Sequence, residues 1–191
     1  MISLPDSVRV VEMLPRDGLQ RLDRFVPTDE KVAMVNELSA TGVDEVEITS
    51  FTHPDAVPNL RDADEVAAGI DRHDDVTYRA LVPNAVGAER AVDADLDKVN
   101  ALTTVSETYC RKNQGMTTEE NLEALREVVK VAHGAGLEVE AGIATSFFCP
   151  YEGRIPRERT LSVLEAAVEA GVDEVTLATS MGMANPVQVS T

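Results

Sequence analysis

The sequence predicts an α/β fold, a TIM (β/α)8-type barrel that is incomplete, with about six βα units in 191 residues. Short apolar runs alternate with longer helical patterns along the chain, which is typical of parallel βαβ units. The phrase Gly-Val-Asp-Glu-Val also occurs twice, at 42–46 and at 171–175. Four units separate the two copies, so each unit takes about 32 residues, which suits a βα barrel.

Each copy of the repeated phrase follows a helical pattern and begins a short apolar run. Its glycine can adopt the left-handed conformation after a helix at little cost, so the phrase marks the passage from a helix into a strand. Weaker copies at 94–99 and 135–139 mark two further passages of this kind. In chain order, we expect strands at about 8–14, 44–50, 76–82, 97–103, 138–144 and 173–178.

Helical patterns fill most of the segments between these strands. The pattern near residue 118 opens with Thr117-Thr118-Glu119-Glu120, a cap followed by acidic residues that suit the positive end of a helix dipole. No linker or low-complexity segment interrupts the alternation, so residues 1–191 are interpreted as a single, partial barrel domain. We expect helices at about 28–40, 62–71, 85–93, 118–135 and 157–170.

The length conflicts with a closed barrel, because eight units need roughly 250 residues. An open, doubly wound sheet is the alternative, and such a sheet usually has a glycine-rich phosphate-binding turn after its first strand. Residues 15–20 instead read Pro-Arg-Asp-Gly-Leu-Gln, which is no such turn. An incomplete barrel therefore agrees better with the sequence.

The chain carries 34 acidic and 17 basic side chains, a formal net charge of −17. This charge should repel nucleic acid and anionic membranes, and no apolar run approaches the roughly 20 residues that span a bilayer. The N-terminus shows no signal-peptide pattern and the two cysteines form no disulfide framework, so we expect a cytoplasmic protein. Only four basic residues are lysines, which favours a halophilic protein that works in concentrated salt; an ordinary acidic protein of a mesophile is the alternative.

In a βα barrel, the chemistry takes place at the carboxyl ends of the strands. Arg16 and Asp17 follow the first strand of this chain. They could simply be an ion pair that closes a turn; alternatively, Asp17 binds a hard divalent cation, Mg²⁺ or Mn²⁺, and Arg16 faces a developing oxyanion. The three histidines have no metal-ligand spacing, so a complete site with histidine ligands cannot be assembled from this chain.

Glu47 lies inside the second apolar strand, where an unpaired carboxylate is costly. Alternation places it on the same face as Thr49. Arg16 could be its partner in the site, and a purely structural salt bridge is the equal alternative. Thr145 follows the fifth strand and is a candidate substrate-binding residue. Cys149 has no neighbouring histidine, which favours a buried thiol over a nucleophile.

Five motifs occur along the chain in a recognisable order. They are Pro15-Arg16-Asp17-Gly18-Leu19-Gln20, Glu47-Ile48-Thr49-Ser50-Phe51, Val82-Pro83-Asn84, Ser106-Glu107 with Arg111-Lys112-Asn113, and Cys149-Pro150-Tyr151-Glu152-Gly153. Together they resemble hydroxymethylglutaryl-CoA lyase, a member of a superfamily of metal-dependent TIM-barrel lyases and Claisen-type synthases. The first and last motifs favour the lyase over the synthases, and the resemblance runs from about residue 8 to residue 189.

The resemblance implies cleavage of 3-hydroxy-3-methylglutaryl-CoA to acetoacetate and acetyl-CoA, and with it a role in leucine degradation and ketone-body metabolism. It implies that Asp17 is a metal ligand and that Arg16 polarises the thioester carbonyl and stabilises the enolate. A metal and an adjacent arginine suit this reaction, which must remove a hydroxyl proton and hold an enolate. The other implied site residues are Gln20 and Glu47, which orient Arg16 and the substrate, and Ser50 and Asn113, which lie near the acyl-CoA.

Two features depart from the family's pattern. Relatives carry Asp-Thr after the sixth strand, whereas Thr179 stands at the position of that aspartate here. The family's His-x-His pair and an asparagine ligand belong to strands seven and eight, beyond Thr191. Three hypotheses remain open: a lyase homologue that ends early, a related acyl-CoA lyase or synthase, and a non-catalytic barrel remnant. A homo-oligomer or a partner chain could supply the missing strands.

Overall fold

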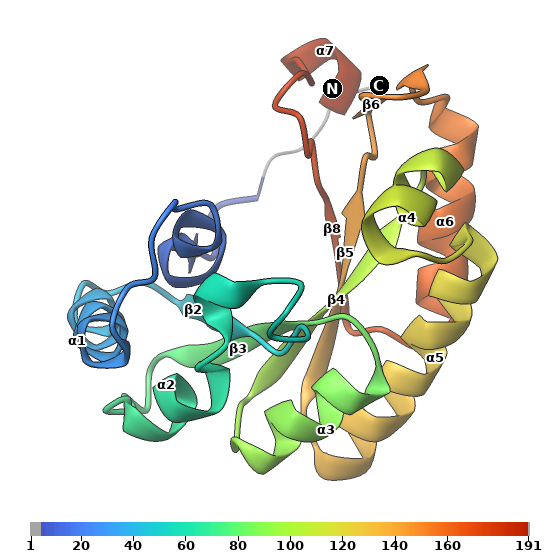
Figure 1. Ribbon diagram of the computed structural model, residues 1–191. Coiled ribbons are helices and arrows are strands. Elements are labelled where there is room, and N and C mark those ends of the chain that lie inside the picture. The colour runs from blue at the N-terminus through green and yellow to red at the C-terminus, as the bar shows by residue number, and fades with distance from the viewer. Residues whose placement is uncertain (1–4, 191) are drawn as a thin grey trace.

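The computed structural model describes residues 5–190, which form a curved, six-stranded parallel sheet. The strand order β1-β2-β3-β4-β5-β8 follows the chain, and Figure 1 shows the sheet curving as a half-barrel. The edge strands β1 and β8 do not pair with each other. The strands are β1 (Val11–Glu12), β2 (Glu45–Ser50), β3 (Thr77–Val82), β4 (Lys98–Thr104), β5 (Glu138–Ala144) and β8 (Glu174–Leu177).

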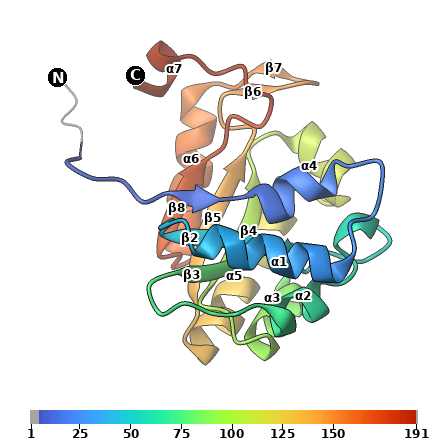
Figure 2. The ribbon, with the colours of Figure 1, turned by 90° about the vertical axis from the view of Figure 1, so that its left-hand side faces the viewer.

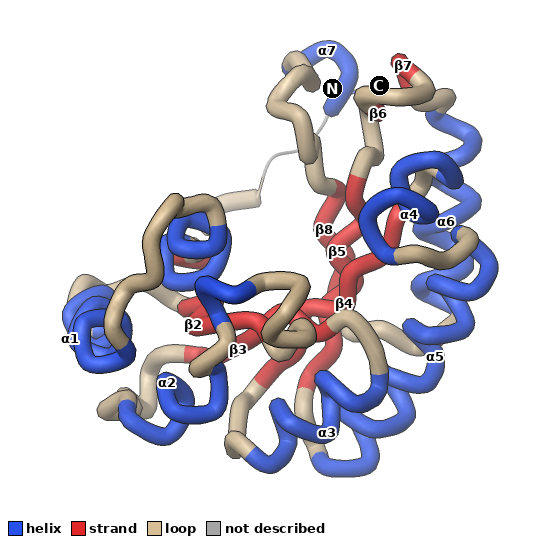
Figure 3. Tube along the Cα trace, viewed as in Figure 1, coloured by secondary structure: helices blue, strands red, loops and turns tan. Residues whose placement is uncertain are grey.

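The helices that connect these strands lie on the outer, convex side of the sheet (Figures 1 and 3). Figure 2 shows this layer from the side, with α1 packed on β2. A doubly wound sheet would have helices on both faces, so the structure confirms the incomplete TIM barrel. The connecting helices are α1 (Thr28–Ser39), α2 (Ala63–Gly69), α3 (Ala85–Asp93), α5 (Thr118–Ala135) and α6 (Arg157–Glu169).

All six expected strands and all five expected helices are present, but the prediction for the first strand is wrong in its bounds. Only Val11 and Glu12 pair with β2, because the π-helix η1 (Leu14–Gly18) begins almost at once. Pro15 has no N–H and could not continue a strand ladder. The elements that were not predicted are η2 (Pro58–Leu60), α4 (Glu107–Gln114), the hairpin of β6 (Phe148–Cys149) and β7 (Gly153–Arg154), and α7 (Pro186–Ser190).

The repeated phrase joins neighbouring strands through its aspartate. In three of the four copies, the carboxylate accepts a hydrogen bond from a backbone N–H at the beginning of the preceding strand, whereas the copy at 135–139 has Glu138 at this position. The glycines of the two strong copies, Gly42 and Gly171, have φ values of 86° and 92°, the left-handed conformation expected there. The bonds join Asp44 to Val10 (2.6 Å), Asp97 to Tyr78 (2.7 Å) and Asp173 to Val139 (2.8 Å).

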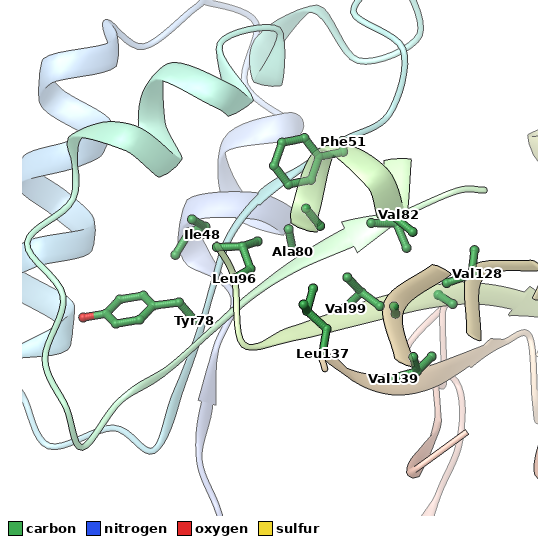
Figure 4. Packing of buried hydrophobic residues seen from close by; sticks show 14 of the residues in the cluster. Ile48, Phe51, Tyr78, Ala80, Val82, Leu96, Val99, Val128, Leu137 and Val139 are labelled. Carbon is green, nitrogen blue, oxygen red and sulfur yellow. The ribbon is translucent and has the colours of Figure 1, made fainter. Parts of the chain in front are cut away.

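Alternation along the strands separates an apolar outer face from a charged inner face. Outward-facing residues such as Ile48, Val99 and Val139 pack against the helices in the main core, which Figure 4 shows. The residues between them, such as Glu47 and Asn100, face the concave side. No helix within residues 5–190 is both long and apolar enough to cross a membrane.

Candidate active site

The π-helix η1 presents Arg16 and Asp17 at the carboxyl end of β1. π-Helices are rare and often occur at functional sites. The N–H groups of Arg16 and Asp17 both donate to the carbonyl of Met13, at 3.2 and 2.8 Å. A Cβ on Gly18 would lie 2.6 Å from Cδ1 of Leu14, so only glycine permits this tight packing without a shift of the leucine.

Arg16 is held between two carboxylates. Its Nε donates to Oε1 of Glu47, and its Nη1 lies 3.1 Å from Oδ1 of Asp17. The guanidinium side chain is 11% exposed and Glu47 is fully buried, so this pair is largely screened from water. The partnership of Glu47 with Arg16 that the sequence allowed is thus present. An Arg16–Asp17 ion pair is present as well, and it leaves the role of both residues open.

The second oxygen of Glu47 binds two groups from neighbouring strands. Nε of Arg79 on β3 lies 3.2 Å from Oε2, and Nδ2 of Asn100 on β4 donates to the same oxygen at 3.0 Å. Glu47 therefore connects Arg16 to the interior of the half-barrel. Neither Arg79 nor Asn100 was predicted as a site residue from the sequence, although each occupies an inward-facing position in an alternating strand.

Arg79 is also the centre of a buried ionic cluster on the inner face of the sheet. It donates two hydrogen bonds of 2.9 Å to Glu140 and one of 3.0 Å to Glu45. Lys98 lies 3.2 Å from Glu45 and also binds Glu174. Burial alone would lower the pKa of Arg79, but its bond to Glu140 and the charges of Glu47 and Glu140 raise that pKa above its ordinary value. Arg79 is therefore a permanent cation.

Glu140, which binds Arg79 twice, stays ionised for the same reason. Burial alone would raise the pKa of Glu140, but the bonds from Arg79 and the positive charges of Arg79 and Lys98 hold it below its ordinary value. Arg9 binds Glu174 and lies 3.1 Å from Glu45 at the open edge. The cluster, with Arg9 exposed at its open edge, thus pairs four cations with four glutamates: Arg9, Arg16, Arg79 and Lys98 with Glu45, Glu47, Glu140 and Glu174.

A divalent cation does not fit the described residues by themselves. Within residues 5–190, no group of three or more His, Cys, Asp or Glu side chains is arranged to hold a metal ion. Asp17 is 42% exposed and contacts Arg16 and Arg21, the latter at 3.6 Å. It could supply one carboxylate ligand, but a stable site for Mg²⁺ or Mn²⁺ needs more oxygen ligands than this.

The other predicted site residues are dispersed. Ser50 is buried, and its hydroxyl lies 2.7 Å from that of Thr52. Asn113 is exposed on α4. Gln20 is half-buried, and its side chain makes no hydrogen bond to another residue of the described range 5–190. Thr145 is buried at the end of β5 in a left-handed conformation, φ 55°, and its hydroxyl accepts the N–H of Ser106 at 3.2 Å. Among the predicted residues, the structure brings only Arg16, Asp17 and Glu47 into one contact network.

The loop 149–153 anchors the beginning of α4. The Glu152 carboxylate accepts hydrogen bonds of 2.8 Å from the Ser106 hydroxyl, the Thr108 N–H and the Arg159 guanidinium. Although burial acts in the opposite direction, these donors lower the pKa of Glu152 to about 2. Cys149 is fully buried, 3.0 Å from the Ser106 hydroxyl, which agrees with the thiol interpretation.

Thr179, the residue at the position of the expected aspartate, follows β8. It lines a cavity of about 470 Å³ together with Ser146 at the end of β5 and Leu161 of α6. Neither an acid nor a histidine lines this cavity within the described range. No proton-transfer group therefore takes the place of the missing carboxylate there.

The HMGL-like family model matches residues 7–191. The chain belongs to the HMGL-like family. Within this family, it is 43% identical to the hydroxymethylglutaryl-CoA lyase YngG of Bacillus subtilis, over 98% of the chain and 62% of that protein. It is 34% identical to the mitochondrial hydroxymethylglutaryl-CoA lyase of Mus musculus, over 97% of the chain and 57% of that protein. The chain thus spans about three fifths of the length of these HMGL-like relatives.

Solved HMGL-like structures share the fold. The crystal structure of the Bacillus subtilis HMG-CoA lyase superposes with a TM-score of 0.95 at 42% identity, covering 98% of the chain and 63% of that structure. An HMG-CoA lyase from Acinetobacter baumannii, in complex with coenzyme A and 3-methylmalate, superposes with a TM-score of 0.93 at 41% identity, covering 99% and 62%. The half-barrel of this HMGL-like chain therefore corresponds to part of a larger barrel in these proteins.

Proposed function

We propose that the chain carries one part of the active site of a carbon–carbon lyase that cleaves 3-hydroxy-3-methylglutaryl-CoA to acetoacetate and acetyl-CoA. The observation that supports this most strongly is Arg16, which two carboxylates hold at the carboxyl end of the strands in a chain whose relatives are named as such lyases. Leucine degradation and ketone-body metabolism, where this cleavage belongs, are part of the proposal.

In the proposed reaction, the bond between C2 and C3 of the acyl group breaks. The C3 hydroxyl loses its proton and becomes the ketone of acetoacetate, while the bonding electron pair moves to C2 and forms the enolate of acetyl-CoA. C2 then takes up a proton, which completes acetyl-CoA and balances the proton lost from the C3 hydroxyl. Arg16 donates to the thioester oxygen, on which the negative charge develops, because its guanidinium is permanently charged and already oriented.

Glu47 and Asp17 fix this guanidinium from two sides. Within the described residues, the side-chain hydrogen bonds of Arg16 use Nε and Nη1, which supports Nη2 as the nitrogen that meets the substrate. Asp17 is also our proposal for one ligand of a divalent cation, Mg²⁺ or Mn²⁺, which would polarise substrate oxygens when bound. The remaining ligands would come from residues other than those described. Ser50, Thr145, Asn113 and Gln20 remain proposed contacts of the acyl-CoA or of Arg16.

The test combines substrate binding with turnover. The chain 1–191 should bind 3-hydroxy-3-methylglutaryl-CoA in calorimetry, and Arg16→Met should weaken this binding about tenfold or more. A chimera that joins the chain to the unmatched part of the Bacillus subtilis relative should release acetyl-CoA in Mg²⁺, whereas the chain alone should not. Binding that is indifferent to Arg16→Met, together with an inactive chimera, would refute the proposal and favour the non-catalytic remnant or a related acyl-CoA enzyme.

A second proposal is self-association or pairing with another chain through the sheet edge. β8 pairs only with β5 within the described residues, and Leu177 on this strand is 39% exposed. Exposed strand edges with apolar neighbours favour association. Light scattering should therefore find more than one chain per particle, and a monomer at high concentration would contradict this. A cytoplasmic location is likewise a proposal, which the two free, buried cysteines support.

A further inference from the structure

Among the described residues that bind the Glu47 side chain, Asn100 is the one with a neutral side chain. It lies on β4, on the inner face of the sheet, and is 7% exposed. Its Nδ2 donates to Oε2 of Glu47 at 3.0 Å, beside the bond from Arg79 to the same oxygen. With Arg16 on Oε1, the Glu47 carboxylate is bound from three directions and cannot rotate without breaking a bond.

The orientation of the Asn100 amide follows from the chemistry of its partner. An ionised carboxylate can only accept hydrogen bonds, so the amide must turn its NH₂ group towards Glu47. The amide oxygen, Oδ1, is then left buried without a hydrogen-bond partner in the described structure. A buried acceptor of this kind destabilises a protein, so an apolar residue at this position would suit stability better.

The neighbouring strand makes room for this side chain. Gly142 on β5 faces the same inner side, and a Cβ on it would lie only 2.6 Å from Oδ1 of Asn100. The absence of a side chain at 142 is therefore what lets the amide reach Glu47. The glycine on β5 and the asparagine on β4 thus act together, and the polar contact that they make possible is the bond from Asn100 to Glu47.

We propose that Asn100 is a positioning residue, which holds Glu47 so that Glu47 in turn presents Arg16 at the mouth of the half-barrel. The unpaired Oδ1 is the consequence of this role. When the NH₂ group of the amide binds Glu47, its oxygen points to a place without a hydrogen-bond donor from residues 5–190. The structural part of the inference concerns only the position of Arg16. Its kinetic part rests on the proposed lyase function, in which Arg16 meets the developing enolate.

The structural part is tested on the chain 1–191 by NMR of the Arg16 Nε–H group. Asn100→Val removes both the donor and the unpaired oxygen, so the chain should stay folded while Glu47 becomes mobile. The exchange of the Arg16 Nε proton with water should then accelerate about tenfold or more. Gly142→Ala should accelerate it as well, because the new methyl group displaces the amide without changing its chemistry. Both substitutions together should add little to Asn100→Val alone.

Thr103→Val is the matched control. Thr103 lies on the same strand, is fully buried and also has an unpaired oxygen, Oγ1, but it faces the opposite side of the sheet. This substitution should leave the exchange of the Arg16 proton within about twofold of the unmodified chain. Unchanged exchange in both Asn100→Val and Gly142→Ala would overturn the inference, and so would equal acceleration by Thr103→Val.

The kinetic part uses the chimera described above. Asn100→Val should lower kcat about tenfold with KM within about twofold, because Arg16 acts mainly in the transition state. Thr103→Val should change neither value. An inactive parent chimera would count against the lyase function alone, since the proton exchange would still decide whether Asn100 positions Arg16. An active chimera whose kcat is indifferent to Asn100→Val would overturn the kinetic part.

Discussion

The Nε of Arg16 donates a hydrogen bond to Oε1 of Glu47, 31 residues further along the chain. This bond joins a π-helix after the first strand to the middle of the second strand. Because the other oxygen of Glu47 binds Arg79, the bond also connects the carboxyl end of the half-barrel to the buried ionic cluster. The proposed chemistry and the stability of the interior therefore depend on one carboxylate.

Glu47→Gln should destabilise the chain strongly. The substitution leaves Arg16 and Arg79 without their shared counter-charge in a buried place, and the loss of one partner of a buried ion pair typically costs about 3–5 kcal/mol. Urea unfolding measures this as a lower midpoint. Glu127→Gln on the exposed face of α5, where the glutamate lies 3.8 Å from Lys130, is the control and should change the free energy by less than about 0.5 kcal/mol. Equal midpoints for the two variants would contradict the account.

Asp97→Ala tests the role of the repeated aspartate. The substitution removes the acceptor for the Tyr78 N–H, which lies 2.7 Å from Oδ2 at the beginning of β3. We expect a loss of about 1 kcal/mol in the free energy of unfolding. Asp74→Ala, in the exposed loop before β3, removes the same charge without such a bond and should be nearly neutral. If both variants unfold at the same urea concentration, the hydrogen bond from the Tyr78 N–H to Asp97 does not stabilise the fold.

The pKa of Glu152 predicts a dependence of stability on pH. Because its folded pKa is about 2 and its ordinary value is 4.5, the ionised carboxylate stabilises the fold fully above about pH 4.5. This contribution disappears as the pH falls from about 4.5 towards 2. In Glu152→Gln, the loss of stability over this range should be smaller than in the unmodified chain. Glu158→Gln on the exposed first turn of α6 should keep the full loss, and identical pH profiles for all three proteins would be evidence against this role.

Salt should stabilise the chain if it is halophilic. The interior cluster is balanced, so the whole excess charge of −17 lies outside it and repels itself in dilute buffer. At about 1 M salt the Debye length is roughly 3 Å, and this repulsion is screened. The melting temperature should rise steeply between dilute buffer and molar KCl, with unfolding on dialysis into low salt. A constant melting temperature would support an ordinary acidic protein instead.

Most of the fold is predictable from the sequence, because its signals are local. The repeated phrase marks where helices end and strands begin, and its glycines Gly42 and Gly171 adopt the expected left-handed conformation. The bond of its aspartate to the neighbouring strand, as between Asp173 and the Val139 N–H, is not local and was not predicted. The first strand is shorter than expected, since an apolar run does not show that a π-helix with Pro15 will follow. α4 was missed because it is polar and buries only Cys110, although Ser106 caps its N-terminus and Gly115 ends it with φ 73°.

The site is predictable only in part, because its contacts depend on register. The motif around Arg16 and the isolated charge of Glu47 are visible in one strand each, so their partnership could be anticipated. The strands must be aligned before Arg79, Asn100 and Glu140 can be recognised as parts of one network. The alignment places Arg79 on β3 beside Glu47, and Glu140 on β5 beside Asn100. The signal that could have identified an ionic interior was the pair of alternating glutamates in each of β2 and β5, together with the single charges of Arg79 in β3 and Lys98 in β4.

The central claim is that Arg16, oriented by Glu47, stabilises the developing enolate. The most direct measurement is kcat/KM for acetyl-CoA release by the chimera and its Arg16→Lys variant. Lysine keeps the charge but cannot bind Glu47 and Asp17 in a planar fork while it also meets the substrate, so kcat/KM should fall by roughly 10²- to 10³-fold. Arg126→Lys on the exposed face of α5 should have no effect. A kcat/KM of Arg16→Lys within about twofold of the parent would contradict the account.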